Sequence, residues 1–189
     1  MKTKLSLILA VVFILSAQAM RGQSSGNPVV DLLLSAYSPR TFTTEPVTDQ
    51  QIDLILKCGI KAPSGRNNQP WRFTVVKDEA TMKAIIGNVI AGNVLILVSG
   101  VEGQDGKTPD FDCALATENM FVAATALGLG ARIYGGPVSA ANAKRADYQV
   151  PSGYKIVMIL RVGNIDKNVD AVSAATTRKA QSEIVNFKK

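Results

Sequence analysis

The 189-residue chain contains no histidine, and this absence excludes several kinds of active site. A Ser-His-Asp triad, a Cys-His nucleophile pair and a zinc site with histidine ligands all require an imidazole. The two cysteines, Cys58 and Cys113, are too few for a structural zinc site, so we expect no metal centre. Any chemistry must therefore depend on carboxylates, Lys, Arg, Tyr, Cys, backbone dipoles or a bound cofactor.

Charged residues are also scarce, at 19% of the chain, and the formal net charge is only +6. Disordered tail proteins carry more charge than this. The Lys and Arg residues are scattered and form no basic stripe of the kind that binds nucleic acid. The 47% hydrophobic content is typical of a globular protein, and the length predicts one domain or at most two small ones. We therefore expect no nucleic-acid partner.

The N-terminal segment has the features of a secretory signal. Lys2 and Lys4 precede the apolar run of residues 5–15, and Ala17-Gln18-Ala19 follows as an A-x-A cleavage site. The run is shorter than the about 20 residues that span a bilayer, and a buried N-terminal helix is the alternative. We expect residues 1–19 to be removed, which lowers the charge from +6 to +4. The mature chain then begins with a linker (20–26), has no membrane span, and is exported, with a bacterial periplasm as the expected compartment.

Export bears on the two cysteines, because an oxidising compartment permits a disulfide. Cys58 and Cys113 lie in separate helical patterns and lack the C-x-x-C spacing of a redox motif. This favours two separate buried thiols, although the sequence leaves pairing open.

Hydrophobic periodicity predicts an α+β chain in which helices and strands are mixed. Thr48 and Gln51 form a capping box, and the helix behind it places on one face Ile52, Ile55, Leu56, Gly59 and Ile60. The apolar run of residues 93–99 indicates a strand that is covered on both faces. The expected helices are 27–36, 49–60, 78–86, 108–128 and 139–146, and the expected strands are 71–77, 93–99, 131–134 and 154–162.

Three polar segments are candidates for ligand binding. Ser38-Pro39-Arg40 combines hydroxyl donors with an Arg fork that suits a phosphate or carboxylate, although a loop Arg is often only solvated. Residues 62–71 carry hydroxyl and amide groups that can contact the edges of a polar heterocycle, or they form a connector of turn residues. The glycines of Tyr134-Gly135-Gly136-Pro137 allow a ligand to approach the backbone closely, or they form a turn.

Taken together, these segments resemble the nitroreductase family of FMN-dependent oxidoreductases. APSGRNNQPW (62–71) is similar to the family's P-S-x-x-N-x-Q-P-W segment, and SPRTF (38–42) is similar to its R-x-S-x-[RK]-x-F motif. ALGLGARIYGG (126–136) resembles the small-residue helix and the strand after it, and RKAQSEIVNF (178–187) resembles the closing basic segment and C-terminal strand. The resemblance implies a single FMN-binding domain over residues 27–189. The implied fold is a central, mostly antiparallel β-sheet flanked by helices in a domain-swapped homodimer.

The resemblance also implies roles for individual residues around FMN. Ser38 and Arg40, joined by Arg178, would bind the phosphate, and Asn88 matches an amide that contacts the ring. Tyr134, Gly135 and Gly136 would lie against the ring, with a backbone N–H at flavin N5. The loop would line the flavin from the neighbouring subunit through Pro63, Ser64, Asn67 and Gln69.

The implied function is the reduction of a nitroaromatic, quinone or similar small acceptor, with the flavin and no protein residue as the catalytic group. NAD(P)H is the family's donor, whereas an exported chain would require another exported or membrane electron donor. Two features depart from the family: Ala36 stands where an Arg is usual, and residues 100–109 lack the helices that cover the flavin in longer members. There are two alternatives. One is an exported FMN-binding electron carrier without its own turnover, and the other is a structural dimer that has lost the flavin.

Overall fold

The computed structural model describes residues 24–103, 109–169 and 178–188, and it divides the chain into two compact units, residues 1–35 and 36–189. The predicted signal segment and the first residues of the linker lie outside the described residues. In the first unit, Asn27 caps helix α2 (Pro28–Ser35) by accepting a hydrogen bond from the N–H of Val29 at 2.9 Å. No residue of α2 is buried within this copy.

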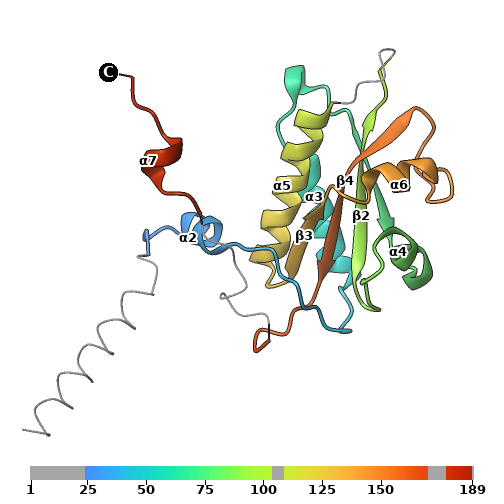
Figure 1. The fold of residues 1–189 in the computed structure, drawn as a ribbon, viewed down its shortest axis with the longest axis horizontal. Helices are drawn as coiled ribbons and strands as arrows, with labels where there is room; N and C mark the ends of the chain where they lie inside the picture. The colour runs from blue at the N-terminus through green and yellow to red at the C-terminus, as the bar shows by residue number, and fades with distance from the viewer. Residues whose placement is uncertain (1–23, 104–108, 170–177, 189) are drawn as a thin grey trace, which may run out of the picture. The chain divides into compact units, whose positions relative to one another are not determined.

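The second unit is built on a four-stranded sheet in the order β1-β2-β4-β3 (Figure 1). All three neighbouring pairs are antiparallel, which confirms the α+β class and the predicted antiparallel sheet. The strands are β1 (Trp71–Val76), β2 (Val94–Val101), β3 (Gly130–Tyr134) and β4 (Tyr154–Gly163). Each was predicted from the sequence to within two residues at either end.

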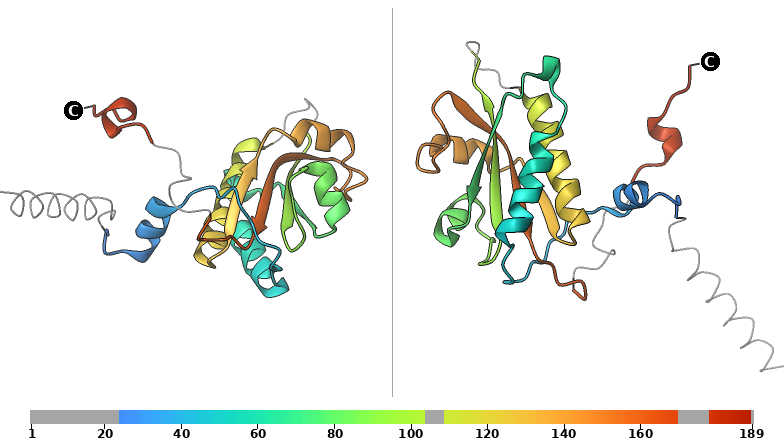
Figure 2. Two further views of the ribbon diagram at one scale, coloured as in Figure 1. Left: turned by 60° about the horizontal axis from the view of Figure 1, so that its bottom comes forward. Right: turned by 180° about the vertical axis from the view of Figure 1, so that it is seen from behind.

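Both faces of the sheet are covered, as the apolar run of β2 predicted. Successive side chains of a strand point to opposite faces, and alternate residues of β2 accordingly belong to two separate core clusters. Val94, Ile96 and Val98 pack with helices α3 (Asp49–Ile60) and α5 (Asp110–Ala126). Leu95 and Leu97 pack with residues of α4 (Glu79–Ile85) and α6 (Val138–Ala143) on the other face (Figure 2).

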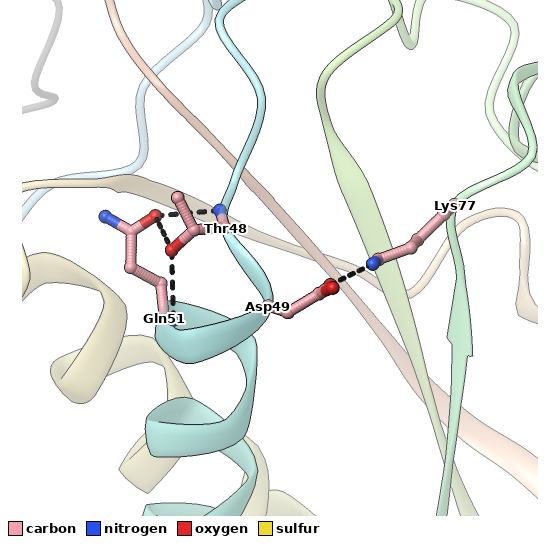
Figure 3. Close-up of polar contacts among 4 residues, drawn as sticks. All are labelled: Thr48, Asp49, Gln51 and Lys77. Carbon is pink, nitrogen blue, oxygen red and sulfur yellow. Dashed lines mark hydrogen bonds and ion pairs between the residues drawn. The ribbon is translucent and has the colours of Figure 1, made fainter.

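Helix α3 begins with the predicted capping box. The Thr48 hydroxyl accepts from the Gln51 N–H at 3.2 Å, and the Gln51 side chain accepts from the Thr48 N–H at 2.9 Å (Figure 3). Asp49 in the first turn also forms an ion pair with Lys77 at the end of β1 (Figure 3). The prediction of the buried face needs one correction, because Ile60 is 51% exposed. It occupies the last position of the helix, where the chain leaves the sheet.

Helices α3 and α5 approach each other closely at Gly59, which has no side chain. A Cβ at Gly59 would lie only 2.7 Å from Cγ of Met120, and Ala116 and Ala124 of α5 are completely buried.

Both cysteines are free thiols, as expected, but only Cys113 is buried. Cys58 is exposed, which corrects the prediction that both thiols are buried.

The C-terminal segment differs from the prediction. In place of a strand, the described residues 178–188 contain the single helical turn α7 (Gln181–Ile184), and every side chain in them is exposed. A strand requires a hydrogen-bonded neighbouring strand along its length, and in the described part of this copy no strand pairs with this segment.

Within the residues described, no helix has the length and apolar character needed to cross a membrane.

Candidate functional site

The chain before α3 crosses one end of the sheet, and two glycines make room for it. A Cβ on Gly130 would lie 2.7 Å from Cγ of Pro39, and one on Gly163 would lie 2.9 Å from Cδ1 of Phe42. Phe42 and Pro39 are buried against these strand ends. Ser38 and Arg40, on either side of Pro39, are therefore held on the surface beside the start of β3, where a ligand can reach them.

The open backbone at the other end of β3 is the second part of the site. Gly135 and Gly136 are exposed, and a Cβ built on either would meet nothing within 4 Å. Neither has a positive φ, so neither packing nor backbone conformation in this copy requires glycine there. A bound group that lies against the backbone would require it.

Tyr134, which ends β3, carries an unsatisfied polar group. Its hydroxyl is buried and has no hydrogen-bond partner among the described residues, whereas buried polar groups are nearly always paired. Its ring packs on the core cluster of α4 and α6, and the guanidinium of Arg132 lies over it at 5.2 Å. Two unobstructed glycines that follow a residue with an unpaired hydroxyl fit a ligand with polar edges.

Asn88 joins this region through an arginine that the sequence analysis did not select. The Asn88 side chain is exposed, and its Oδ1 lies 3.4 Å from Nη1 of Arg161 in β4. Arg161 pairs across the sheet with Arg132 of β3, so Asn88 lies near the same two strands as Tyr134. Asn88 and Arg161 are 73 positions apart in the sequence. A single Arg in an apolar strand gives no sequence signal for a contact of this kind.

The loop before β1 has unusual backbone geometry. Three non-glycine residues have positive φ, namely Arg66 at 53°, Asn67 at 58° and Gln69 at 47°. The Ser64 hydroxyl accepts from the Gln69 N–H at 3.0 Å, and the Gln69 amide donates to Asn67 Oδ1 at 3.3 Å. Such conformations are unfavourable and cluster at functional sites. Here the loop holds them while it leaves exposed Pro63, Asn67 and Gln69.

This loop lies at the opposite end of the sheet from Ser38 and Arg40. Val101, the last residue of β2, donates its N–H to the Pro70 carbonyl at 3.0 Å. Val94, the first residue of β2, pairs with Val162 beside Gly163. At roughly 3.3 Å per residue, the strand separates the two ends by roughly 23 Å.

The predicted site residues therefore fall into two groups within one copy. The first group surrounds the β3–β4 pair and consists of Ser38, Arg40, Asn88 and Tyr134–Gly136. The second group lies at the far end of β2 and consists of Pro63, Ser64, Asn67 and Gln69. Arg178 begins the exposed segment 178–188, and its contact with a phosphate stays a prediction.

Comparisons with known proteins agree with this architecture. Residues 33–97 and 87–164 match the model of the nitroreductase family. A protein of Archaeoglobus fulgidus, provisionally named as an NADH dehydrogenase/NAD(P)H nitroreductase, is 33% identical over 108 residues, which are 52% of this chain and 62% of that protein. The alignment thus spans less than two thirds of that relative's length.

Solved structures share the fold over most of both chains. A protein of Desulfovibrio desulfuricans, provisionally named as a nitroreductase and crystallised with FMN, has a TM-score of 0.72 and 29% identity, covering 86% of this chain and 98% of that one. A nitroreductase of Bacteroides fragilis with bound FMN has a TM-score of 0.69 and covers 86% of this chain and all of the other. Its identity is 20%, so it speaks for the fold alone.

Proposed function

The chain belongs to the nitroreductase family, and from this premise we propose that the protein is an FMN-dependent oxidoreductase that reduces a nitroaromatic, quinone or similar small acceptor. The observation that carries the proposal is the end of β3, where Gly135 and Gly136 are exposed and unobstructed and the residue before them, Tyr134, has a buried hydroxyl without a hydrogen-bond partner among the described residues. These residues fit a planar ring with polar edges. The similarity to a structure that holds FMN supports FMN as that group.

The residues of this chain would position the cofactor. Ser38 and Arg40 would bind the phosphate through a hydroxyl and a charge-assisted fork, and Arg178 would contact the same phosphate. The backbone of Gly135 and Gly136 would donate an N–H to N5, and Asn88 would contact the ring. FMN, when bound, supplies the redox chemistry by accepting electrons from a donor and passing them to the acceptor. No protein acid or base is needed, which suits a chain without histidine.

The site that we propose is completed by a second copy of the chain. Ser38 and Arg40 lie at one end of β2 and Pro70 at the other, a separation of roughly 23 Å. Within one copy the loop therefore lies far from the residues that we assign to the phosphate. In a domain-swapped homodimer, the loop of each copy lines the flavin of the other through Pro63, Ser64, Asn67 and Gln69.

The electron donor depends on where the protein resides. Relatives are named for NAD(P)H, a mainly cytosolic donor. The signal-like residues 1–19 favour export to a periplasm, and we propose that an exported or membrane electron donor then replaces NAD(P)H. Cell fractionation and the N-terminal sequence of the mature protein test this. A cytoplasmic protein that retains residue 1 and turns over rapidly with micromolar NADH would overturn it.

The first experiment on the function is the visible spectrum of the purified protein, before and after incubation with FMN and desalting. We expect one flavin per subunit to be retained. A folded protein that retains none leaves only the structural-dimer alternative. Retained flavin without turnover of any nitroaromatic or quinone favours the electron carrier, for which the half-buried Ala36 at the usual position of an Arg is the motivating observation.

Arg40 provides the residue-level test. A hydrogen bond to a charged group contributes roughly 1.5–3 kcal/mol, so Arg40→Ala should weaken FMN binding more than tenfold. Lys83→Ala is the matched control, because Lys83 is an exposed cation that pairs with Glu79 on α4. FMN titration followed by flavin fluorescence measures both dissociation constants. Equal constants for Arg40→Ala and wild type would remove Arg40 from the phosphate site.

A further inference from the structure

Arg161 is a buried cation whose partners are all neutral. Its side chain is 2% exposed, its Nε donates to Asn93 Oδ1 at 2.8 Å, and its Nη1 lies 3.4 Å from Asn88 Oδ1. The guanidinium also lies 4.0 Å from the centre of the Phe42 ring. Among the described residues no carboxylate forms an ion pair with it. A buried charge without a counter-charge is costly.

The neighbouring strand increases this cost. Arg132 of β3 lies directly opposite Arg161 in the register of the sheet, and like charges at such positions repel each other. Arg132 stacks on the Tyr134 ring and likewise forms no ion pair with any residue that the structure describes. Two guanidinium groups thus lie on one face of the sheet, and their polar and aromatic partners among the described residues are neutral. This arrangement favours an incoming negative charge.

Arg161 is linked to several of the segments that carry the predicted FMN residues. Phe42 lies two residues after Arg40, Asn88 is the exposed amide, and Arg132 covers Tyr134. Asn93 ties the same network to the Arg40 segment, since its amide donates to the Thr43 carbonyl at 3.2 Å. Arg161 engages the Asn88 side-chain oxygen at 3.4 Å, and because Asn88 is exposed, its NH₂ group is accessible as a donor.

We propose that Arg161 is a positioning residue that supplies the fixed positive charge of the flavin site and orients Asn88 as a hydrogen-bond donor to the ring. The inference rests on the proposed function and adds to it the residue that favours the reduced, negatively charged flavin over the oxidised one. A donor amide with a cation behind it stabilises negative charge on the ring. The guanidinium is buried in advance, so it needs no reorganisation when that charge develops.

Three variants test the charge and its consequence. Arg161→Gln keeps a polar donor but removes the charge, Arg161→Lys keeps the charge, and Arg145→Met is the control. Arg145 is a half-buried arginine that pairs instead with Glu102 at 3.3 Å. Each purified protein is titrated with FMN, and the midpoint potential of the bound flavin is measured by dye equilibration. Thermal unfolding without FMN reports the structural effect of each change separately.

We expect Arg161→Gln to lower the preference for reduced over oxidised FMN at least tenfold, which for a two-electron couple is about 30 mV in midpoint potential. Arg161→Lys should stay within threefold of wild type, and Arg145→Met should leave the potential unchanged even if it unfolds at a lower temperature. Equal potentials in Arg161→Gln and wild type would overturn the inference. A weaker FMN affinity with an unchanged potential would also overturn it, because Arg161 would then serve the phosphate. A wild-type protein that binds no FMN would instead overturn the proposed function, and this inference with it.

Discussion

The carboxylate of Asp112 accepts a hydrogen bond from the backbone N–H of Gly65, with Oδ1 3.0 Å from the nitrogen. The two residues are 47 positions apart, and the bond ties the first turn of α5 to the loop before β1. Within that loop, three non-glycine residues have left-handed backbone conformations. Strained geometry of this kind persists only where neighbouring contacts enforce it. Asp112 provides one such contact from outside the loop.

Replacing Asp112 with Ala should release the loop. Hydrogen bonds to charged groups contribute roughly 1.5–3 kcal/mol, and because this one is exposed we expect the free energy of unfolding to fall by about 1 kcal/mol. Trypsin should cleave faster after Arg66, an exposed residue of the loop. Asp53→Ala, which removes the exposed pair with Lys57 on α3, is the control and should change neither quantity appreciably. An unchanged cleavage rate in Asp112→Ala would show that the loop is held by its internal bonds alone.

Gln69 and Gln149 form a natural pair for testing the strain of the loop. Their φ angles are 47° and 59°, but only Gln69 lies in the loop. A left-handed conformation costs a non-glycine residue roughly 1–2 kcal/mol. Replacement by glycine removes this cost, but the greater entropy of glycine in the unfolded chain offsets part of the gain. Both Gln69→Gly and Gln149→Gly should therefore raise the free energy of unfolding, by up to about 1 kcal/mol in urea denaturation.

The two glycine variants should separate in ligand binding. Gln69→Gly removes an amide that we place against the flavin of the neighbouring subunit, so its FMN affinity should fall while that of Gln149→Gly stays unchanged. Equal affinities would mean that the strain at Gln69 has no functional counterpart. A loss of stability in Gln69→Gly would mean that its bond to Asn67 outweighs the relief of strain.

Much of the fold was predictable because its signals are local. The capping box of Thr48 and Gln51, the apolar run of β2 and Gly128 after α5, whose φ is +77°, each determine structure from a few neighbouring residues. The C-terminal strand was wrong for the opposite reason. A strand depends on a partner, and in the described part of one copy the segment has none, so local propensity leaves a single helical turn at Gln181–Ile184.

The site was predictable only in part. Polar and glycine-rich segments could be identified from their composition, whereas Arg161 could not, since its role depends on Asn88, Asn93 and Phe42, which reach it from distant parts of the chain. The link from Asp112 to Gly65 is of the same kind. Residues that bind a ligand leave a motif, but residues that position them are defined by tertiary contacts.

Two glycines distinguish a packing role from a binding role. A Cβ at Gly163 would lie 2.6 Å from Nδ2 of Asn93 and 2.9 Å from Phe42, whereas one at Gly136 would meet nothing within 4 Å. Gly163→Ala should therefore overpack the strand end and cost about 1–3 kcal/mol of stability. Gly136→Ala should change the free energy of unfolding by less than about 0.5 kcal/mol and still weaken FMN binding. Urea denaturation and FMN titration of both variants give the comparison, and normal FMN affinity in Gly136→Ala would move the ring away from this glycine.

The thiols should differ sharply in reactivity. Cys58 is exposed and Cys113 is buried, and burial followed by the charges of Asp110 and Asp112 raises the pKa of Cys113 from 9.0 to about 12. Since the thiolate is the reactive form, an aromatic disulfide reagent at pH 8 should modify one thiol in the native protein and two after denaturation. Cys58→Ser should abolish the native reaction. If neither thiol reacts after denaturation without reductant, the cysteines are joined in a disulfide.

The raised pKa of Cys113 also predicts how stability changes with pH. Between pH 9 and 12 the folded protein keeps the thiol proton while the unfolded chain loses it, so the stabilisation is fully present below about pH 9 and is lost as the pH rises toward about 12. Urea denaturation of wild type and Cys113→Ala at several values from pH 8 to 10.5 measures this. The wild-type free energy of unfolding should fall more steeply above pH 9 than that of the variant, which has no thiol to titrate. Cys113→Ala also leaves a small cavity, but that cost is independent of pH and shifts the whole curve. Parallel curves would contradict the prediction, because they would mean that the thiol titrates alike in the unfolded chain and in the folded chain, where Cys113 is buried.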